Sequence, residues 1–286
     1  MPAEAALPAA AARRRARRAR ANPLDFGRKR WVQVALVLNF FFLYFPIVAL
    51  IAFSFNNSRR NIVWQGFTFD YYVKAYHNAS LHEAFANSMI VAATSTVVST
   101  VIGTLLGVAL YRYRFPGKGP FEGLVHLPIV IPEVCMGVAM LAFFAALGVP
   151  LGLFTIIVSH IAFSFPFVAV VVRARMVGFD ESLEEASRDL GATRLQTFWN
   201  VTLPYLLPGV IAGALLAFTL SLDDFVITFF TSGPGSTTFP IKIYSMVRFS
   251  VTPEVNAAST VLIALTLTLT LLAMWVQRRT GQRTLG

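Results

Sequence analysis

The chain has 286 residues, of which 56% are apolar and only 13% are charged. This composition is too apolar for an ordinary water-soluble domain and is typical of a protein embedded in a lipid bilayer. The 26 phenylalanines fit that setting, because side chains that face lipid need no polar partner. The single cysteine, Cys135, excludes an internal disulfide, and its place in an apolar run indicates a packing role.

The formal net charge of +10 is concentrated at the start of the chain, where residues 1–30 hold nine Lys and Arg. Such a run suits either nucleic acid or the anionic face of a membrane. Because it directly precedes an apolar stretch that begins at Trp31, we interpret it as a basic cytoplasmic tail that contacts lipid, and we expect no nucleic-acid partner. The stretch from Trp31 to Phe55 exceeds the roughly 7 to 15 apolar residues of a cleaved signal peptide, so we expect it to remain as a helix.

Six segments reach the length of about 20 mostly apolar residues that a membrane-spanning helix needs. They are 31–55, 87–111, 122–147, 151–174, 206–230 and 254–277. With both termini inside, nineteen Lys and Arg lie on the cytoplasmic side and five outside, so the positive-inside rule favours an N-in, C-in topology. The sequence therefore predicts an all-α, multi-pass membrane protein with a membrane domain at 31–277 and a cytoplasmic tail at 278–286.

The longest internal loop, residues 180–204, carries signals for two short helices. Ser182 and Glu185 have the spacing of a capping box, which predicts the start of the first helix. Gly191 follows, and glycine most easily takes the left-handed conformation that ends a helix. We therefore expect one short helix between Ser182 and Gly191.

The second short helix is predicted by the same rules. Thr193 and Gln196 repeat the capping-box spacing, and Pro204 is expected to end the helix because proline lacks a backbone N–H and restricts the residue before it. Both helices carry an apolar edge, which would fit a partner's groove, lie on the lipid surface, or pack under the helix bundle. The edge residues are Leu183, Ala186, Leu190, Leu195, Phe198 and Trp199.

The same loop resembles that of the permease subunits of ATP-binding-cassette (ABC) importers. Their pattern is Glu-Ala-Ala, three residues, Gly, nine residues, an aliphatic residue, any residue, and Leu-Pro. The matching residues here are Glu185, Ala186, Ser187, Gly191, Val201, Leu203 and Pro204, and Ser187 is a small-for-small departure. The resemblance implies a bacterial inner-membrane protein with the MetI-like permease fold. It also implies that this loop forms the coupling helix, which sits in a cleft of the ATPase subunit.

No catalytic residue is expected in the chain itself. A phosphate-binding loop needs G-x-x-x-x-G-K-[ST], whereas around Gly117-Lys118-Gly119 the first position is Arg112 and no hydroxyl follows the lysine. The four histidines show no metal-ligand spacing, so no metal site is predicted. By the resemblance, ATP and Mg²⁺ are bound by separate ATPase subunits, and this chain needs no cofactor.

Three acidic residues fall well inside predicted spans rather than at their first residue, and a charge at such a depth costs roughly 2.5 to 3.5 kcal/mol and is therefore a candidate for function. Glu133 lies in the third span, and Asp223 and Asp224 lie toward the outer end of the fifth. Together with aromatic side chains they would suit a small organic cation. In the structural alternative, an aspartate caps the span or pairs with a basic residue, and a neighbouring helix holds Glu133. The aromatic candidates are Phe225, Phe229 and Tyr244, and the basic ones are Lys242 and Arg248.

Residues 221–260 are similar to the corresponding stretch of permeases in spermidine and putrescine importers. The shared residues are Asp223-Asp224, Gly233-Pro234-Gly235, Ile243-Tyr244-Ser245, Pro253-Glu254 and Asn256-Ala257. The resemblance implies a polyamine as the solute, with another small organic solute as the alternative.

The family resemblance also implies the partners: a second, related permease, two ATPase subunits and an external solute-binding protein. An ion-coupled secondary transporter is an alternative from another class, but the sequence has no convincing internal repeat. A scaffold or receptor is a third reading, and it would leave the loop at 180–204 without a purpose.

Overall fold

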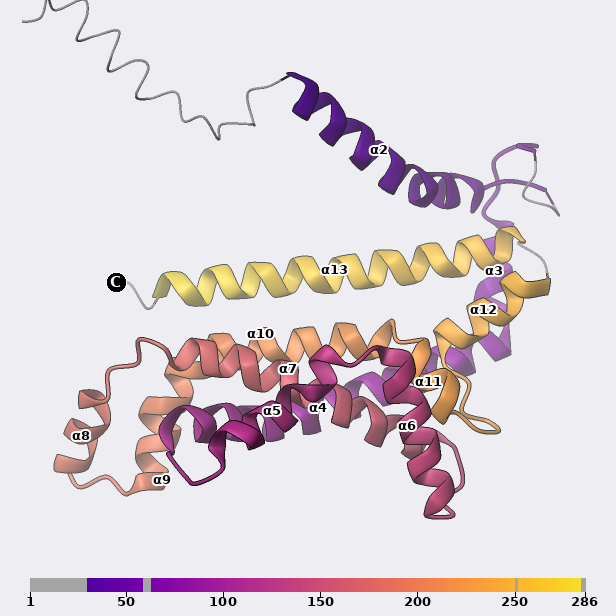
Figure 1. Ribbon diagram of the computed structural model, residues 1–286. Helices are drawn as coiled ribbons and strands as arrows, with labels where there is room; N and C mark the ends of the chain where they lie inside the picture. Colours follow the sequence, from indigo (N-terminus) through magenta and orange to yellow (C-terminus); the bar gives the residue numbers. More distant parts are fainter. Residues whose placement is uncertain (1–29, 59–62, 250–251, 284–286) are drawn as a thin grey trace, which may run out of the picture. The chain divides into compact units, whose positions relative to one another are not determined.

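The computed structural model describes residues 30–58, 63–249 and 252–283, most of them in helices (Figure 1). Contacts divide the chain into two compact units, Met1–Phe53 and Ser54–Gly286. The predicted basic tail falls almost wholly outside the described residues. The all-α prediction is confirmed, because the one extended pairing in the described part is an isolated bridge between Asn56 and Phe67.

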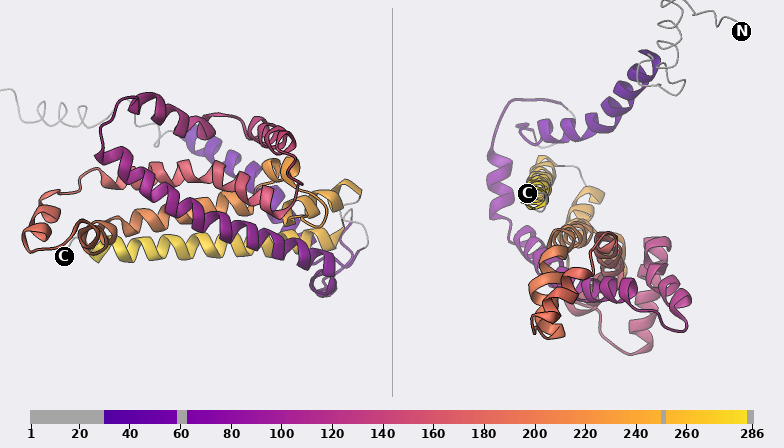
Figure 2. Two further views of the ribbon diagram at one scale, coloured as in Figure 1. Left: turned by 90° about the horizontal axis from the view of Figure 1, so that it is seen from below. Right: turned by 90° about the vertical axis from the view of Figure 1, so that its left-hand side faces the viewer.

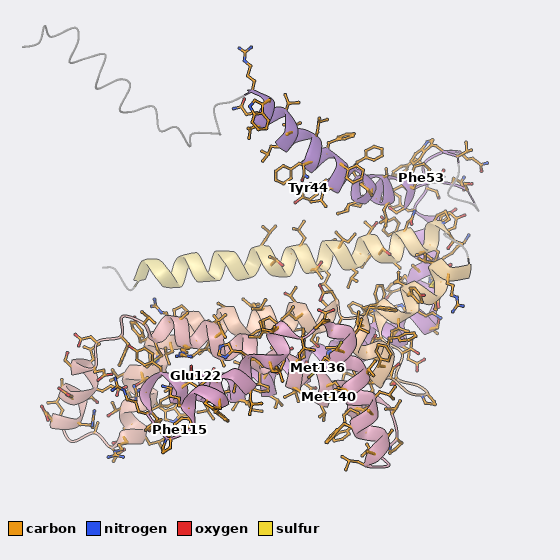
Figure 3. The ribbon with its side chains drawn as sticks, in the orientation of Figure 1. Tyr44, Phe53, Phe115, Glu122, Met136 and Met140 are labelled. Atoms are coloured by element: carbon orange, nitrogen blue, oxygen red, sulfur yellow. The ribbon has the colours of Figure 1, made fainter. Side chains whose placement is uncertain are left out.

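The described part of the first unit is one helix, α2 (Arg30–Phe53). Its side chains are apolar on every side, and none of its 24 residues is buried. Tyr44 and Phe53, labelled in Figure 3, belong to this helix, and Phe42 is 83% exposed. A helix that is apolar all round needs an apolar surrounding, which agrees with the first predicted span.

The second unit holds the remaining helices, shown in Figure 1 and from two further sides in Figure 2. In chain order they are α3 (Asp70–His77), α4 (Ala79–Arg112), α5 (Lys118–Val130), α6 (Glu133–Ala146), α7 (Leu153–Met176), α8 (Ser182–Asp189), α9 (Arg194–Thr197), the π-helix η2 (Phe198–Thr202), α10 (Leu203–Leu222), α11 (Val226–Thr231), α12 (Phe239–Phe249) and α13 (Pro253–Arg283).

The core of the second unit lies where α4, α7 and α10 pack side by side (Figures 1 and 2). Glycines allow this close approach: a Cβ added to Gly103 would lie 2.6 Å from the Cβ of Val168, and one on Gly213 would lie 3.0 Å from its Cγ1. Small residues at helix crossings are the usual means of packing helices in a bilayer, where apolar burial gives little driving force. Buried members of this core are Val108, Val168, Val172, Met176, Leu206 and Ala217.

Four of the six predicted spans correspond to described helical stretches that are long and apolar enough to cross a membrane: Arg30–Phe53, Ala79–Arg112, Leu153–Met176 and Arg194–Leu222. The third predicted span is a pair of helices, α5 and α6, and the chain bends by 108° at the short break between them. The sixth falls within α13, whose side chains are described only in part. The count of six and the N-in, C-in topology therefore stay predictions.

Three sequence expectations are corrected by the fold. The fifth span does not run unbroken to residue 230, because α10 ends at Leu222 and the backbone breaks before α11. The helix of the second span begins earlier than expected, because the Asn78 side chain caps it by accepting from the N–H groups of Ser80 and Leu81. Cys135, expected to be packed inside, is exposed on α6.

Candidate functional sites

The first helix of the loop 180–204 begins differently from the prediction. Ser182 is the first residue of α8 rather than its cap, and its backbone N–H donates to Oδ1 of Asp180 at 3.0 Å. The predicted capping box with Glu185 is therefore wrong, because the nearby carboxylate of Asp180 is the stronger acceptor. The hydroxyl of Ser182, and then its backbone N–H, hold the pKa of Asp180 below its usual value.

The end of α8 follows the prediction. Gly191 has a φ of +90°, a left-handed conformation that side chains other than glycine rarely adopt. Its N–H donates to the carbonyl of Arg188 at 2.9 Å, which closes the last turn. The chain is thereby free to turn into the second loop helix.

The second loop helix starts as predicted and continues further than predicted. The Thr193 hydroxyl accepts from the N–H of Gln196 at 3.3 Å, and the Gln196 side chain accepts from the N–H of Thr193 at 2.8 Å. Pro204 does not end the helix, because α9 passes through η2 directly into α10 and Pro204 stands in the first turn of α10. The wider π turn before it tolerates a residue without an N–H.

A buried carboxylate that the sequence analysis missed anchors the loop to the bundle. Glu184 is 7% exposed, and its Oε1 accepts from Nη2 of Arg112, at the end of α4, and from the hydroxyl of Thr202 in η2. Arg112 lies 72 residues away in the chain, so no local pattern could have indicated the pair. α8 is thus bound both to α4 and to η2, which leads into α10.

The apolar edge of the loop is exposed, which argues against packing under the bundle. Leu190 is 90% exposed, Leu195 67%, Trp199 58% and Leu183 49%. Ala186 is exposed beside them, and Phe198 is partly buried. A surface this apolar at the end of a bundle is a candidate for contact with another molecule.

The residues of the loop motif divide between this surface and the bundle. Glu185 is exposed and, within the described chain, has no side-chain partner, and Pro204 is exposed in the first turn of α10. The Ser187 hydroxyl lies 3.3 Å from that of Thr197, and Val201 packs against the core of α4, α7 and α10. Leu203 is half-buried.

A second candidate site lies at the break between α10 and α11. The Asp224 carboxylate accepts from the N–H of Ile227 at 3.2 Å and from the N–H and hydroxyl of Thr228 at 2.8 and 2.7 Å. Nε2 of His160, on α7, lies 3.2 Å from the same carboxylate. Asp224 is therefore buried and caps α11, as in the structural alternative, but with His160 as its basic partner.

Asp223 has the opposite environment. It is exposed, and its carboxylate forms no hydrogen bond or ion pair with any other described residue, Lys242 and Arg248 included. The negative charges of Asp224 and Glu133 both act on it. Asp223 is thus a free carboxylate beside other negative charge, which is a setting that attracts a cation.

Glu133 comes from the other helix break. It opens α6 directly after Pro132, and α6 packs against α11 so closely that a Cβ on Gly137 would lie 2.6 Å from the Phe230 ring. Aromatic rings complete the site: Tyr244 lies 4.8 Å from Phe225 between ring centroids, and Phe225 and Phe229 lie 5.6 Å apart. The structure thus gathers the predicted acidic and aromatic candidates around two breaks that the sequence did not fully predict.

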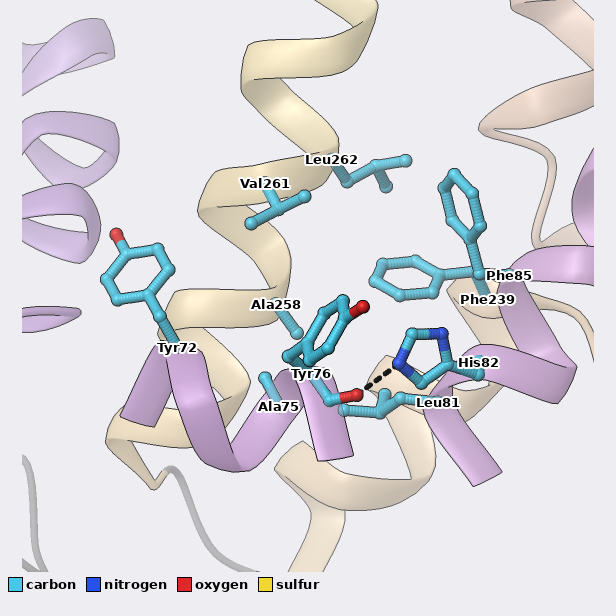
Figure 4. A pocket seen from close by; sticks show the side chains of 10 residues that line it. All are labelled: Tyr72, Ala75, Tyr76, Leu81, His82, Phe85, Phe239, Ala258, Val261 and Leu262. Carbon is cyan, nitrogen blue, oxygen red and sulfur yellow. Dashed lines mark hydrogen bonds between the residues drawn. The ribbon is translucent and has the colours of Figure 1, made fainter. Parts of the chain in front are cut away.

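A separate apolar pocket of about 410 Å³ lies between α3, α4, α12 and α13 (Figure 4). The rings of Tyr76, Phe85 and Phe239 line it, and the one polar contact drawn there joins His82 to the carbonyl of Tyr76. Such a lining suits an apolar group rather than a cation. No cluster of three His, Cys, Asp or Glu that could hold a metal occurs in the described parts of the chain.

The second unit thus has an exposed apolar loop at one end of its bundle and two broken helices at the other. The sequence places the chain in a known family of transport permeases. Residues 99–286 match the model of the binding-protein-dependent transport system inner membrane component. The chain is therefore a multi-pass protein of the bacterial inner membrane and a permease component of an ABC importer.

Among curated proteins, the chain is 43% identical over 237 residues to the spermidine/putrescine transport system permease protein PotC of Escherichia coli strain K12. The match covers 83% of this chain and 90% of that protein. It is 39% identical over 249 residues to the putrescine transport system permease protein PotI of the same strain. This match covers 85% of this chain and 89% of that protein.

Two solved structures share the fold. A bacterial ABC transporter that imports the acidic polysaccharide alginate matches with a TM-score of 0.65 and 20% identity, over 87% of this chain and 96% of that chain. The MetNI methionine ABC transporter, in an inward-facing conformation, matches with a TM-score of 0.59 and 23% identity. This match covers 70% of this chain and 95% of that chain.

Proposed function

We propose that this chain forms one half of the translocation pore of a polyamine importer. The observation that carries the proposal is the similarity to the polyamine permeases, which spans most of both chains and includes the segment around Asp223. The free carboxylate of Asp223, the nearby Glu133 and the ring of Tyr244 support it, because carboxylates and aromatic faces both attract organic ammonium groups.

The proposed complex contains a second, related permease, two ATPase subunits that bind ATP and Mg²⁺, and an external solute-binding protein. Membrane lipid surrounds the helices, and nucleic acid has no role. This chain would hydrolyse no ATP and hold no cofactor or metal of its own.

In the proposed mechanism, the exposed edge formed by Leu183, Leu190, Leu195 and Trp199 docks in a groove of an ATPase subunit. ATP-driven closure of the two ATPases brings the two docking loops together, and the helix bundles then open toward the binding protein. A polyamine released there meets the carboxylate of Asp223, where its ammonium groups exchange water for charge-assisted contacts. ATP hydrolysis returns the pore to the inward-facing state.

The substrate class is tested by uptake of labelled putrescine and spermidine into cells that lack this gene, with and without the gene on a plasmid. Loss of uptake that the plasmid restores would support the proposal. Normal polyamine uptake in a deletion strain that has no second polyamine system would contradict the substrate and leave the family membership intact.

The coupling role is tested with Gly191→Val. A β-branched side chain is strained at a φ of +90°, at a cost of about 1 to 2 kcal/mol, so the loop turn should distort and uptake should fall strongly. Gly148→Val is the matched control, because Gly148 also has a left-handed φ, of +67°, and also has no heavy atom within 4 Å of an added Cβ, but it lies outside the loop.

The readout for both variants is the amount of ATPase that co-purifies with the permease and the rate of uptake. We expect only Gly191→Val to lose ATPase. Equal effects of the two variants would show that backbone strain alone, rather than the loop, controls assembly.

A further inference from the structure

A buried polar network links α7 to the helix break at Asp223 and Asp224. His160, in the middle of α7, is 2% exposed. Its Nδ1 lies 2.7 Å from the hydroxyl of Ser221, in the last turn of α10, and its Nε2 lies 2.9 Å from the hydroxyl of Thr228 in α11. Ser221 in turn lies 3.0 Å from the hydroxyl of Ser95 on α4. One imidazole therefore joins the two sides of the break, and α4 is attached through Ser221.

The hydrogen-bond partners define which ring nitrogen carries the proton. The Thr228 hydroxyl donates to Asp224, so it can only accept from His160. Nε2 must then be the N–H that faces Thr228 and the Asp224 carboxylate, since a lone pair there would be repelled by the carboxylate. In a neutral ring, Nδ1 is left as an acceptor for the hydroxyl of Ser221, whose oxygen also lies within hydrogen-bond distance of the Ser95 hydroxyl. Every polar group in this chain of bonds has a partner.

The network explains how a break survives inside the apolar part of the bundle. Ending α10 at Leu222 and restarting at α11 leaves backbone N–H groups without helical partners, which is costly where water is scarce. Asp224 satisfies two of them, at Ile227 and Thr228. His160 in turn fixes the direction of the Asp224 carboxylate.

The geometry points to His160 as a positioning residue of the translocation path, which turns Asp224 inward and leaves Asp223 as the single carboxylate of the pair that meets the solute cation. The inference rests on the proposed function for the identity of the solute, but the geometry it claims does not depend on which solute is carried. His160 itself is buried and touches no solute.

Replacing His160 by Gln or by Asn distinguishes the contact made by its Nε2 from the contact made by its Nδ1. The side-chain amide of Gln reaches the place of Nε2, whereas that of Asn reaches only the place of Nδ1. We expect His160→Asn to lower polyamine uptake roughly tenfold, because a buried carboxylate loses a donor, while His160→Gln keeps most of the uptake. The amount of permease and of co-purified ATPase should be similar for both.

An Asn variant that transports as well as the Gln variant would overturn the inference. So would a loss of uptake in both that follows the amount of permease in the membrane, because the role would then be one of folding alone.

A labelling experiment tests the geometry without any solute. The chain has a single cysteine, so Cys135→Ser provides a background in which Asp223→Cys is the only thiol. A small, membrane-impermeant cationic thiol reagent, applied to the purified whole complex, should label this thiol readily. The rate of labelling should change severalfold when His160→Asn is added, because the Asp224 carboxylate beside the thiol loses a donor, and should stay as in the parent with His160→Gln.

A thiol at position 223 that resists the reagent, or labels equally in all three backgrounds, would overturn the inference even if the chain does carry polyamines. Conversely, labelling as expected together with normal polyamine uptake in the deletion strain would support the role of His160 and reject the polyamine assignment.

Discussion

The loop at 180–204 and the break between α10 and α11 each present two consecutive carboxylates, and each region buries one of them and exposes the other. Glu184 and Asp224 are buried with a basic side chain and a threonine hydroxyl, whereas Glu185 and Asp223 are exposed without a partner among the described residues. Glu184 and Glu185 lie on α8, where neighbouring residues point about 100° apart, and Asp223 and Asp224 lie in the non-helical break between α10 and α11, so in each pair one member can enter the bundle while the other faces out. In both regions, one carboxylate holds the structure and the other is free for contact.

The two regions differ in the base that they use. Glu184 pairs with Arg112, which always carries its charge and whose side chain is 26% exposed. Asp224 is held by backbone N–H groups, a hydroxyl and the ring of His160, which is 2% exposed. Near water a single ion pair suffices, whereas deeper in the bundle several hydrogen-bond donors share one negative charge, since each added ion costs solvation.

The largest effect is expected for Arg112→Leu, which leaves Glu184 buried without its base. We expect the free energy of unfolding to fall by about 3 kcal/mol, somewhat reduced by the water that reaches Arg112. Thermal unfolding of the detergent-purified complex measures it. The double variant Arg112→Leu with Glu184→Leu should recover most of the loss, and Glu185→Gln is the control without effect. Equal losses in the single and double variants would contradict the role of the ion pair.

Next in size is the contrast between Asp224→Asn and Asp223→Asn. The Asn amide keeps one acceptor but turns donors toward the N–H groups that Asp224 satisfies, so we expect a loss of about 2 kcal/mol in stability. Asp223→Asn should leave thermal stability unchanged and slow polyamine uptake. The comparison fails if Asp223→Asn destabilises the complex as much as Asp224→Asn does.

A smaller effect is expected when a threonine hydroxyl is removed at constant shape. Thr202→Val and Thr228→Val should each lower stability by about 1 kcal/mol, with the larger loss at Thr228 because Asp224 has no permanently charged partner. Thr219→Val is the control, since the Thr219 hydroxyl is exposed and bonds only to a carbonyl of its own helix. A larger loss at Thr202 would reverse the ranking of the two regions.

The smallest effect concerns Asp180, a carboxylate with hydrogen bonds but without burial. Its pKa is lowered by Ser182, so its contribution to stability is present above the ordinary value of 3.8 and disappears as pH falls through the lowered folded-state pKa. Asp180→Asn should therefore be slightly less stable than the wild type at neutral pH and equal to it in strong acid. Melting temperatures measured across the acid range would show this convergence, and a constant gap would contradict it.

Local rules predicted much of the fold and of the loop. The composition gave the membrane class, the turn at Gly191 follows from glycine's freedom, and the cap at Thr193 follows from its spacing to Gln196. The motif of the loop also led to the correct family.

Contacts between distant parts of the chain were beyond these rules. His160 meets Ser221 across 61 residues and Thr228 across 68, and nothing near His160 in the sequence indicates either contact. The end of α10 at Leu222 was missed because its apolar pattern continues into α11, and the interruption is stabilised by α7 rather than by a local breaker. The continuation through Pro204 was missed because a π turn leaves no clear mark in the sequence.

The two regions are joined by one uninterrupted stretch of helix, Arg194–Leu222, of 29 residues. Its longest straight part, α10, has 20 residues and at 1.5 Å per residue is about 30 Å long, close to the thickness of the hydrocarbon core of a bilayer, and η2 turns into it at a steep angle (Figures 1 and 2). Arg194 stands in the loop 180–204 and Asp223 directly follows Leu222, so the two sites lie at the two ends of one continuous helical stretch. If the loop docks as proposed, a tilt imposed there is passed toward Asp223 through helix alone, without an intervening loop.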